Sequence, residues 1–249
     1  MRFLDHFSGR SDLYAEARPK YPEPLFRFVA DHAPDKRHVW DCATGNGQAA
    51  IALAGHFDLV SASDASSDQI ENAVKHARIQ YSVQPAEATV YAQGAFDAVC
   101  VSQALHWFDI PLFFQEVRRV TTPGGLFVAW GYDWFQITPE IDSAFDQCLR
   151  QVIKDDWAAQ NALLWNGYRD VYIPFEPIEA PELKIETDWS LYQLLAYVQT
   201  WSSVKRCTNR IGDQFMDDAA LTLAQLWGDP EVEKPIIMPL HIRAGRIRI

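Results

Sequence analysis

The chain lacks the residue patterns that mark secreted, zinc-binding or membrane-spanning proteins. Its four cysteines are scattered without a C-x-x-C pair, which argues against a zinc site and for reduced thiols: Cys42, Cys100, Cys148 and Cys207. No apolar stretch approaches the roughly 18 residues that a membrane span needs, and the N-terminus has no apolar core of a signal peptide. We therefore expect a cytoplasmic protein with no metal ion and no membrane partner.

Positive charge is also scarce. Lys and Arg together number 22 against 33 Asp and Glu, which gives a formal net charge of −11. Broad nucleic-acid binding depends on neutralising phosphates with Lys and Arg, so we expect no nucleic-acid partner. The 249 residues suit a single α/β domain with an inserted segment. Nothing in the sequence indicates an oligomeric state.

The most informative feature that is present is a glycine-rich turn. The run VWDCATGNGQ, from Val39 to Gln48, continues as AAIALA and predicts a strand, a tight loop and a helix. Gly45 and Gly47 let a ligand lie directly against the main chain. Gln48 stands where a dinucleotide fingerprint has its third glycine, which disfavours a dehydrogenase, and no Lys-Ser or Lys-Thr follows as in a P-loop. The turn predicts a nucleotide-like ligand without a pyrophosphate.

A second acidic residue lies where the glycine turn predicts it. Asp64 follows Asp41 by 23 residues, at the end of an apolar run, and an acid at about this distance is the usual ligand of a ribose. A predicted helix follows with Ser67 as its cap and apolar residues at helical spacing as far as Ala77. Asp64 could equally be a helix cap, since Asp at a strand end often is one.

These motifs resemble the class I S-adenosylmethionine-dependent methyltransferases, with Ala43 at the first glycine of their loop motif. The runs SQALHWFD and EVRRVTTPGGLFVAWGY resemble the type 11 group, close to the trans-aconitate methyltransferase-like proteins. The resemblance implies S-adenosyl-L-methionine as the cofactor. It also implies an enzyme that transfers a methyl group to a small-molecule acceptor, for which a carboxylate is one option. A protein that binds the cofactor or its product S-adenosylhomocysteine without catalysing transfer is the alternative.

The same resemblance implies a Rossmann-like α/β fold. It has a seven-stranded, mostly parallel sheet of order 3-2-1-4-5-7-6, with helices on both faces and the last strand inserted antiparallel. We expect a single methyltransferase domain over 1–249, an N-terminal lid or helix in 1–30, and a helical, aromatic substrate cap inserted at 132–174. The sixth and seventh strands are expected near 183–187 and 236–243. Residues 139–157 are expected to form one amphipathic helix.

Candidate site residues follow the strand ends, because ligands of open α/β sheets bind beyond the carboxyl ends of the strands. By resemblance, the cofactor-binding residues are Tyr14, Arg18, Asp41, Ala43, Gly45, Gly47, Asp64, Ala65, Gln69, Ala86, Glu87, Ser102, Gln103 and Ala104. Arg18, in the expected lid, also suits the carboxylate of the cofactor.

Acceptor-side residues are predicted around the fourth strand and the inserted region. His106 is the catalytic candidate, either as a general base or as a residue that only orients its surroundings. Trp107, Trp134 and Trp201 are expected to line the acceptor pocket, and burial in the core is the alternative for each of them.

Overall fold

The computed structural model describes residues 19–248, which fall into two compact units. Unit 1 contains Trp134–Ala159 and Ile185–Met238, together with 19–20. Unit 2 contains Tyr21–Asp133, Gln160–Lys184 and 239–248. The region expected to form a cap is therefore divided, with 134–159 in unit 1 and 160–174 in unit 2. Within the described residues, no helix is long and apolar enough to cross a membrane.

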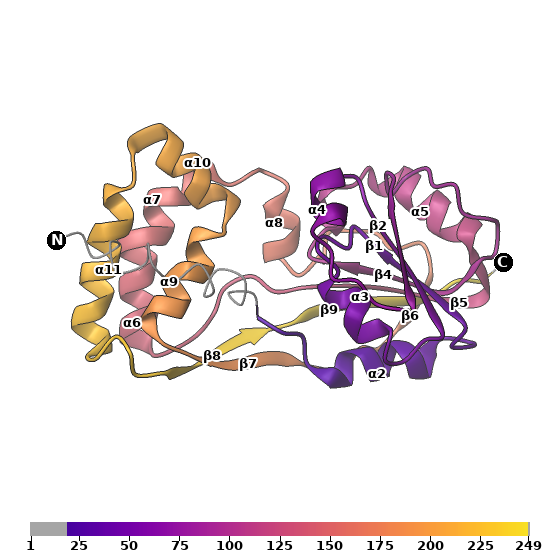
Figure 1. Cartoon of the computed structure of the whole chain (residues 1–249), viewed down its shortest axis with the longest axis horizontal. Helices are drawn as coiled ribbons and strands as arrows, with labels where there is room; N and C mark the ends of the chain where they lie inside the picture. The colour runs from indigo at the N-terminus through magenta and orange to yellow at the C-terminus, as the bar shows by residue number, and fades with distance from the viewer. Residues whose placement is uncertain (1–18, 249) are drawn as a thin grey trace. The chain divides into compact units, whose positions relative to one another are not determined.

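Unit 2 is built on a seven-stranded sheet of order β3-β2-β1-β4-β5-β9-β6, which confirms the predicted fold class and strand order (Figure 1). β1 to β5 run parallel, whereas β9 lies antiparallel between β5 and β6. The central strands β1 and β4 are almost continuously buried because both faces of the sheet are covered. The strands are β1 (His38–Cys42), β2 (Leu59–Asp64), β3 (Ile79–Val83), β4 (Phe96–Ser102), β5 (Thr121–Gly131), β6 (Glu176–Ile178) and β9 (His241–Arg246).

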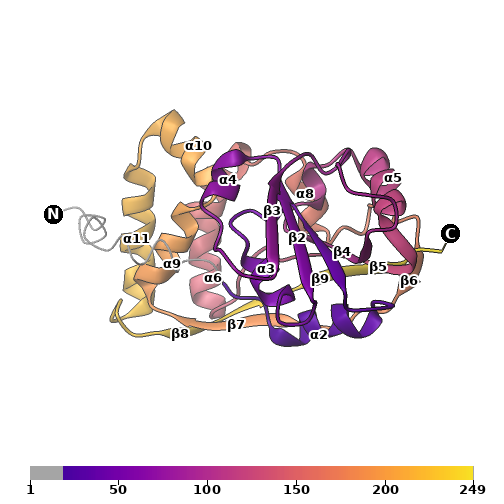
Figure 2. The ribbon, with the colours of Figure 1, turned by 45° about the vertical axis from the view of Figure 1, so that its right-hand side comes forward.

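Helices cover both faces of this sheet. Figure 2 shows α5 (Ile110–Val120) on the opposite side of the sheet from α2 (Glu23–His32) and α3 (Gln48–Leu53). Phe113 of α5 packs in one buried cluster with Trp40 and Phe127 of the sheet. Unit 2 also contains shorter helical segments. α4 (Ser67–Glu71) follows β2, η2 (Leu105–Trp107) follows β4, and α8 (Asn161–Trp165) begins just after the chain re-enters unit 2 at Gln160.

Two predicted elements of unit 2 are wrong in detail. The edge strand of the sheet is β6, not the segment at 183–187, which belongs to a separate two-stranded sheet of β7 (Lys184–Trp189) and β8 (Lys234–Pro239). The helix after β2 is capped by Ser66, not Ser67, and it ends at Glu71, short of Ala77. The Asn72 side chain donates to the Asp68 carbonyl (2.7 Å), a local bond that competes with further helical bonding.

Unit 1 is mainly helical. The expected single helix over 139–157 is four segments that follow one another directly: α6 (Pro139–Phe145), the π-helical η3 (Asp146–Arg150), α7 (Gln151–Ile153) and η4 (Lys154–Asp156). The Thr138 side chain caps this run by accepting from the Ile141 N–H. The remaining helices are α9 (Leu191–Gln199), α10 (Ser202–Ile211) and α11 (Gln214–Trp227).

Candidate functional site

The loop between β1 and α3 has a left-handed backbone at every second residue. Ala43, Gly45 and Gly47 have φ values of 55°, 58° and 90°. A Cβ atom on Gly47 would lie 2.2 Å from the Tyr81 hydroxyl, so this position has no room for a side chain. The Thr44 N–H donates to the Ser63 carbonyl (2.9 Å), which fixes the loop against the end of β2. At Gly47, glycine is therefore favoured both by the backbone conformation and by close packing.

Asp64, at the end of β2, holds the glycine loop in place. Its Oδ2 accepts a hydrogen bond from the Gly45 N–H (2.9 Å), and its Oδ1 accepts one from the Ser66 N–H (2.9 Å). A carboxylate has about four acceptor positions, so both oxygens can accept a further hydrogen bond from a ligand. Ala65 and Gln69 are exposed beside it. Gln69 Oε1 lies 3.6 Å from where a Cβ atom of Gly45 would stand.

Asp41 is fully buried two residues before the loop. Its Oδ2 accepts a hydrogen bond from the Thr44 hydroxyl (2.5 Å), whereas Oδ1 has no hydrogen-bond partner among residues 19–248. Burial raises the pKa of Asp41 to about 7, and the Thr44 hydrogen bond offsets this only in part. A buried carboxyl with one unpartnered oxygen suits a cationic group of a ligand, which would satisfy that oxygen and favour the ionised form.

The segment after β3 contributes Ala86 and Glu87. Ala86 is buried, and it belongs to the apolar cluster that contains Trp40. Glu87 Oε1 accepts a hydrogen bond from the Asp109 N–H (3.0 Å), and Asp109 is in turn the N-cap of α5. Glu87 thus joins the loops that follow β3 and β4.

The end of β4 is fixed by two side-chain interactions. The Ser102 hydroxyl donates to the Tyr21 hydroxyl (2.7 Å). Gln103 has a left-handed backbone (φ 56°), and its side-chain amide pairs with the Tyr132 main chain, donating at 3.1 Å and accepting at 3.3 Å. Ala104 is buried next to it. Sequence reasoning missed Tyr21, although this residue is the tyrosine of the RPKYP run before α2.

His106 is buried in η2 immediately after these residues. Its Nδ1 lies 3.1 Å from the Tyr168 hydroxyl, and the two rings are stacked with centroids 6.1 Å apart. Burial lowers the pKa of His106 to about 4, so the imidazole is neutral at pH 7. Tyr168 was also missed, because no motif in the sequence marks it.

The three predicted pocket tryptophans divide between the units. Trp107 of unit 2 is 50 % exposed. Trp134 and Trp201 of unit 1 lie together, with ring centroids 5.7 Å apart, and the Arg150 guanidinium lies 3.9 Å above the Trp134 ring. Trp201 is 9 % exposed and contacts further aromatic rings, namely Phe135, Phe145, Trp157 and Tyr197. Tyr14 and Arg18, the predicted lid residues, lie outside the described residues.

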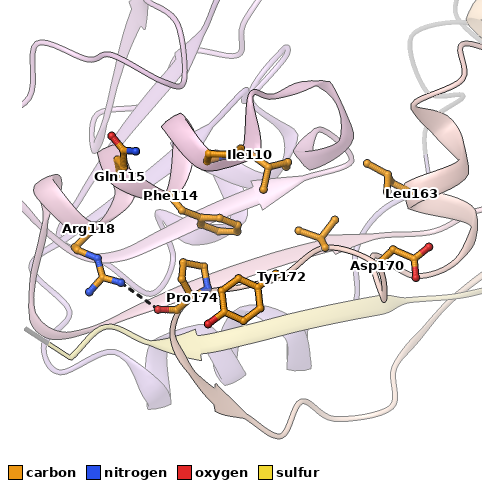
Figure 3. Close-up of a pocket in the computed structure, with 10 residues that line it drawn as sticks. Ile110, Phe114, Gln115, Arg118, Leu163, Asp170, Tyr172 and Pro174 are labelled. Atoms are coloured by element: carbon orange, nitrogen blue, oxygen red, sulfur yellow. Dashed lines mark hydrogen bonds between the residues drawn. The ribbon is translucent and has the colours of Figure 1, made fainter.

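A separate hollow of about 510 Å³ lies between α5 and the segment that follows α8 (Figure 3). Its wall is mostly apolar, and Arg118 and Asp170 are the charged side chains that line it. The Arg118 guanidinium donates to the Pro174 carbonyl (3.1 Å). None of the predicted site residues that the structure describes lines this hollow, so it is distinct from the strand-end cluster.

Comparisons with known proteins agree on one family. A model of a methyltransferase domain matches residues 40–129. A Dictyostelium discoideum protein named as a methyltransferase is 30% identical over 205 residues, which covers 81% of this chain and 78% of the relative. A Saccharomyces cerevisiae protein named as an S-adenosylmethionine-dependent methyltransferase is 26% identical over 154 residues, covering 58% of this chain and 51% of its own length. The solved structure of an Anaeromyxobacter dehalogenans protein, described as a type II methyltransferase, superposes with a TM-score of 0.87. The two chains are 38% identical, and the superposition covers 93% of this chain and 98% of the Anaeromyxobacter dehalogenans chain.

Proposed function

The chain belongs to the class I S-adenosylmethionine-dependent methyltransferases, and we propose that it transfers a methyl group from S-adenosyl-L-methionine to a small-molecule acceptor. The narrower resemblance to the trans-aconitate methyltransferase-like group stays a prediction. The observation that supports a cofactor site best is the hydrogen bond between Asp64 and the Gly45 N–H (2.9 Å). It brings the acid at the end of β2 against the glycine loop after β1, as a nucleoside-binding site requires.

The residues at this edge of the sheet fit the cofactor in charge and in space. We assign the ribose hydroxyls to the remaining acceptor positions of Asp64, and the methionyl ammonium to the buried oxygen of Asp41 that lacks a partner among the described residues. The side-chain-free main chain at Gly45, where Gln69 Oε1 lies 3.6 Å from the position of a Cβ atom, gives room for close approach. The other predicted cofactor ligands in the described chain, at the ends of β3 and β4, belong to the same unit.

The proposed methyl transfer depends more on the orientation of cofactor and acceptor than on acid–base catalysis. When bound, the cofactor would supply a sulfonium methyl group for transfer to a nucleophilic atom of the acceptor, with S-adenosylhomocysteine as the leaving group. Aligning two reactants in this way contributes up to about 7 to 11 kcal/mol. We propose a carboxylic acid as the acceptor class, since a carboxylate has no proton to lose. The support is His106, whose low pKa of about 4 makes it a weak base.

The setting of the reaction follows from composition and cysteine chemistry. We propose a cytoplasmic enzyme that acts on a free metabolite and not on nucleic acid. The support is the net charge of −11 and the absence of disulfides among the described cysteines. A cofactor-binding protein without transfer activity is the second candidate. His106, the catalytic candidate, is buried and hydrogen-bonded to Tyr168, which favours this second candidate.

Thermal unfolding with added ligands tests the cofactor assignment. At about 100 times its dissociation constant, a ligand bound only by the native state adds about 2.7 kcal/mol, which raises the unfolding temperature by roughly 5 to 10 °C at this size. We expect this shift with S-adenosylmethionine and S-adenosylhomocysteine and not with NAD or ATP. Asp64→Asn should abolish it. Asp68→Asn is the matched control, because Asp68 is an exposed aspartate four residues away, in the first turn of α4.

Release of S-adenosylhomocysteine in the presence of carboxylic acids, alcohols and amines then tests transfer. A thermal shift accompanied by turnover of an acid supports the proposed reaction. A shift without turnover of any compound favours the inactive cofactor-binding protein. A shift with NAD alone, or no shift at all, contradicts the cofactor assignment.

A further inference from the structure

His106 and Tyr168 form a buried polar pair. Their side chains come from segments 62 residues apart, after β4 and after α8, and both belong to unit 2. Tyr168 is fully buried, and its hydroxyl lies 3.1 Å from His106 Nδ1. A buried phenol usually needs a hydrogen-bond partner, and within the described chain His106 is the partner of this one.

The backbone at Tyr168 is held in an unfavourable conformation. Its φ of 57° lies in the left-handed region, which is a genuine outlier for a bulky residue. The Tyr168 N–H donates to the Leu163 carbonyl (2.8 Å), and its carbonyl accepts from the Arg243 guanidinium (2.5 Å). Gly167 before it is also left-handed, and a Cβ atom there would lie 3.1 Å from the His241 ring. Strain of this kind persists where the surrounding structure fixes it, often at functional sites.

The pair defines which ring nitrogen of His106 carries the proton. Burial raises the pKa of Tyr168 and lowers that of His106 to about 4, so the phenol is protonated and the imidazole is neutral at pH 7. The phenol O–H finds no other acceptor in the described residues, so it donates to His106 Nδ1. A neutral imidazole has one donor and one acceptor nitrogen. The ring proton is therefore on Nε2.

We propose that Tyr168 is a positioning residue that holds His106 in the Nε2–H tautomer, so that His106 donates a hydrogen bond to the methyl acceptor instead of removing a proton from it. This rests on the proposed methyl transfer. The His106 lone pair that a base would use is at Nδ1 and already accepts from Tyr168. The acceptor carboxylate attacks the methyl group with one oxygen lone pair, and another of its lone pairs accepts the hydrogen bond from His106 Nε2–H. No proton is transferred.

Nitrogen-15 NMR of the histidine rings in the full chain tests the tautomer without requiring activity. The chain has seven histidines, and the signals lost in His106→Gln identify the ring of interest. We expect a protonated Nε2 and an unprotonated Nδ1 in the wild type. Tyr168→Phe should abolish this preference and give a mixture of tautomers. Tyr172→Phe is the matched control, because Tyr172 is 82 % exposed on the same segment (Figure 3) and should leave the spectrum unchanged.

Kinetics with the acid found in the turnover screen tests the role in transfer. Tyr168→Phe should lower kcat by about tenfold, the usual effect of one hydrogen bond, and leave the thermal shift with S-adenosylmethionine unchanged. A wild-type ring protonated at Nδ1, or a Tyr168→Phe spectrum like that of the wild type, overturns the positioning role. An altered tautomer with unchanged kcat overturns the donor role in transfer. Failure of the wild type to bind S-adenosylmethionine would instead overturn the proposed function, and the NMR result would still stand.

Discussion

At the scale of single residues, Asp41 shows how burial sets the chemistry of a site. An aspartate in an unfolded chain has a pKa of about 3.9, whereas burial raises the pKa of Asp41 to about 7 in the folded protein. Between these two values the native state binds the proton more tightly than the unfolded state does. The contribution of Asp41 to stability is therefore fully present below about pH 4 and is lost as the pH rises through about 7.

This titration leads to a prediction about cofactor binding. If the methionyl ammonium pairs with Asp41, the bound state favours the carboxylate, so binding should tighten as the pH rises from 6 to 8 and should release up to about one proton at pH 6. Titration calorimetry in buffers of different ionisation enthalpy measures both effects. Asp41→Asn should bind more weakly and release no proton from this position. The same proton release in Asp41→Asn as in the wild type would show that another group is responsible.

At the scale of elements, the loop between β1 and α3 contains two glycines that are required for different reasons. A Cβ atom at Gly45 would meet Gln69 Oε1 at an ordinary 3.6 Å, so only the backbone opposes a side chain there. At Gly47 the same atom would lie 2.2 Å from the Tyr81 hydroxyl, and the backbone is again left-handed (φ 90°). An alanine at position 45 therefore tests backbone strain alone, whereas an alanine at position 47 tests backbone strain together with steric exclusion.

We therefore predict different costs for the two alanine substitutions. Gly45→Ala should lower the free energy of unfolding by about 1 to 2 kcal/mol, the cost of a left-handed non-glycine residue, and Gly47→Ala should lower it further. Urea denaturation of both variants measures the difference. Adding Tyr81→Phe to Gly47→Ala removes the clashing oxygen and should recover part of the loss. Equal losses for the two alanines, with no recovery in the double variant, would contradict the steric argument.

Much of the element order of the sheet could be predicted from the sequence, because its signals are local. The apolar run of β1, the glycine loop and Asp64 specify a strand, a turn and a second strand within 27 residues of the chain, His38 to Asp64. The edge strand could not be predicted in the same way. β6 has only three residues and contains Pro177, which reads as a loop, whereas β7 alternates like a strand but pairs in another sheet.

For the candidate site, too, the sequence carries only local signals. Residues next to the strand ends could be named from the loop motif and from the rule that ligands bind beyond the carboxyl ends of strands. Tyr21 and Tyr168 could not be, because their partners Ser102 and His106 lie 81 and 62 residues away along the chain. The cofactor role of Gln103 stays a prediction, and the pairing of its side-chain amide with the Tyr132 main chain could not be predicted because it depends on the β4–β5 register.

At the scale of the whole molecule, the two units have different cores. The core of unit 2 is the sheet with its covering helices, and the predicted cofactor residues among the described chain all belong to it. Unit 1 contains a cluster of aromatic rings around Trp201, contributed by the segment after β5, by the α6 to η4 run and by α9. A tryptophan in such a cluster contributes to stability whether or not one edge of it also faces a substrate.

The tryptophan predictions can be separated on this basis. Trp201→Ala removes a 9 %-exposed ring and should lower the free energy of unfolding by about 3 to 5 kcal/mol. Hydrogen exchange should therefore accelerate in α9, α10 and α11 more than in β1, β4 and β5. Equal acceleration of exchange in both units would show that Trp201 stabilises more than its own core.

Trp107 is 50 % exposed, so Trp107→Ala should change the unfolding free energy by no more than about 0.5 kcal/mol. If Trp107 lines the acceptor pocket, the same variant should raise the KM for the acceptor and leave the affinity for S-adenosylmethionine unchanged. An unchanged KM for the acceptor would show that Trp107 does not line the pocket.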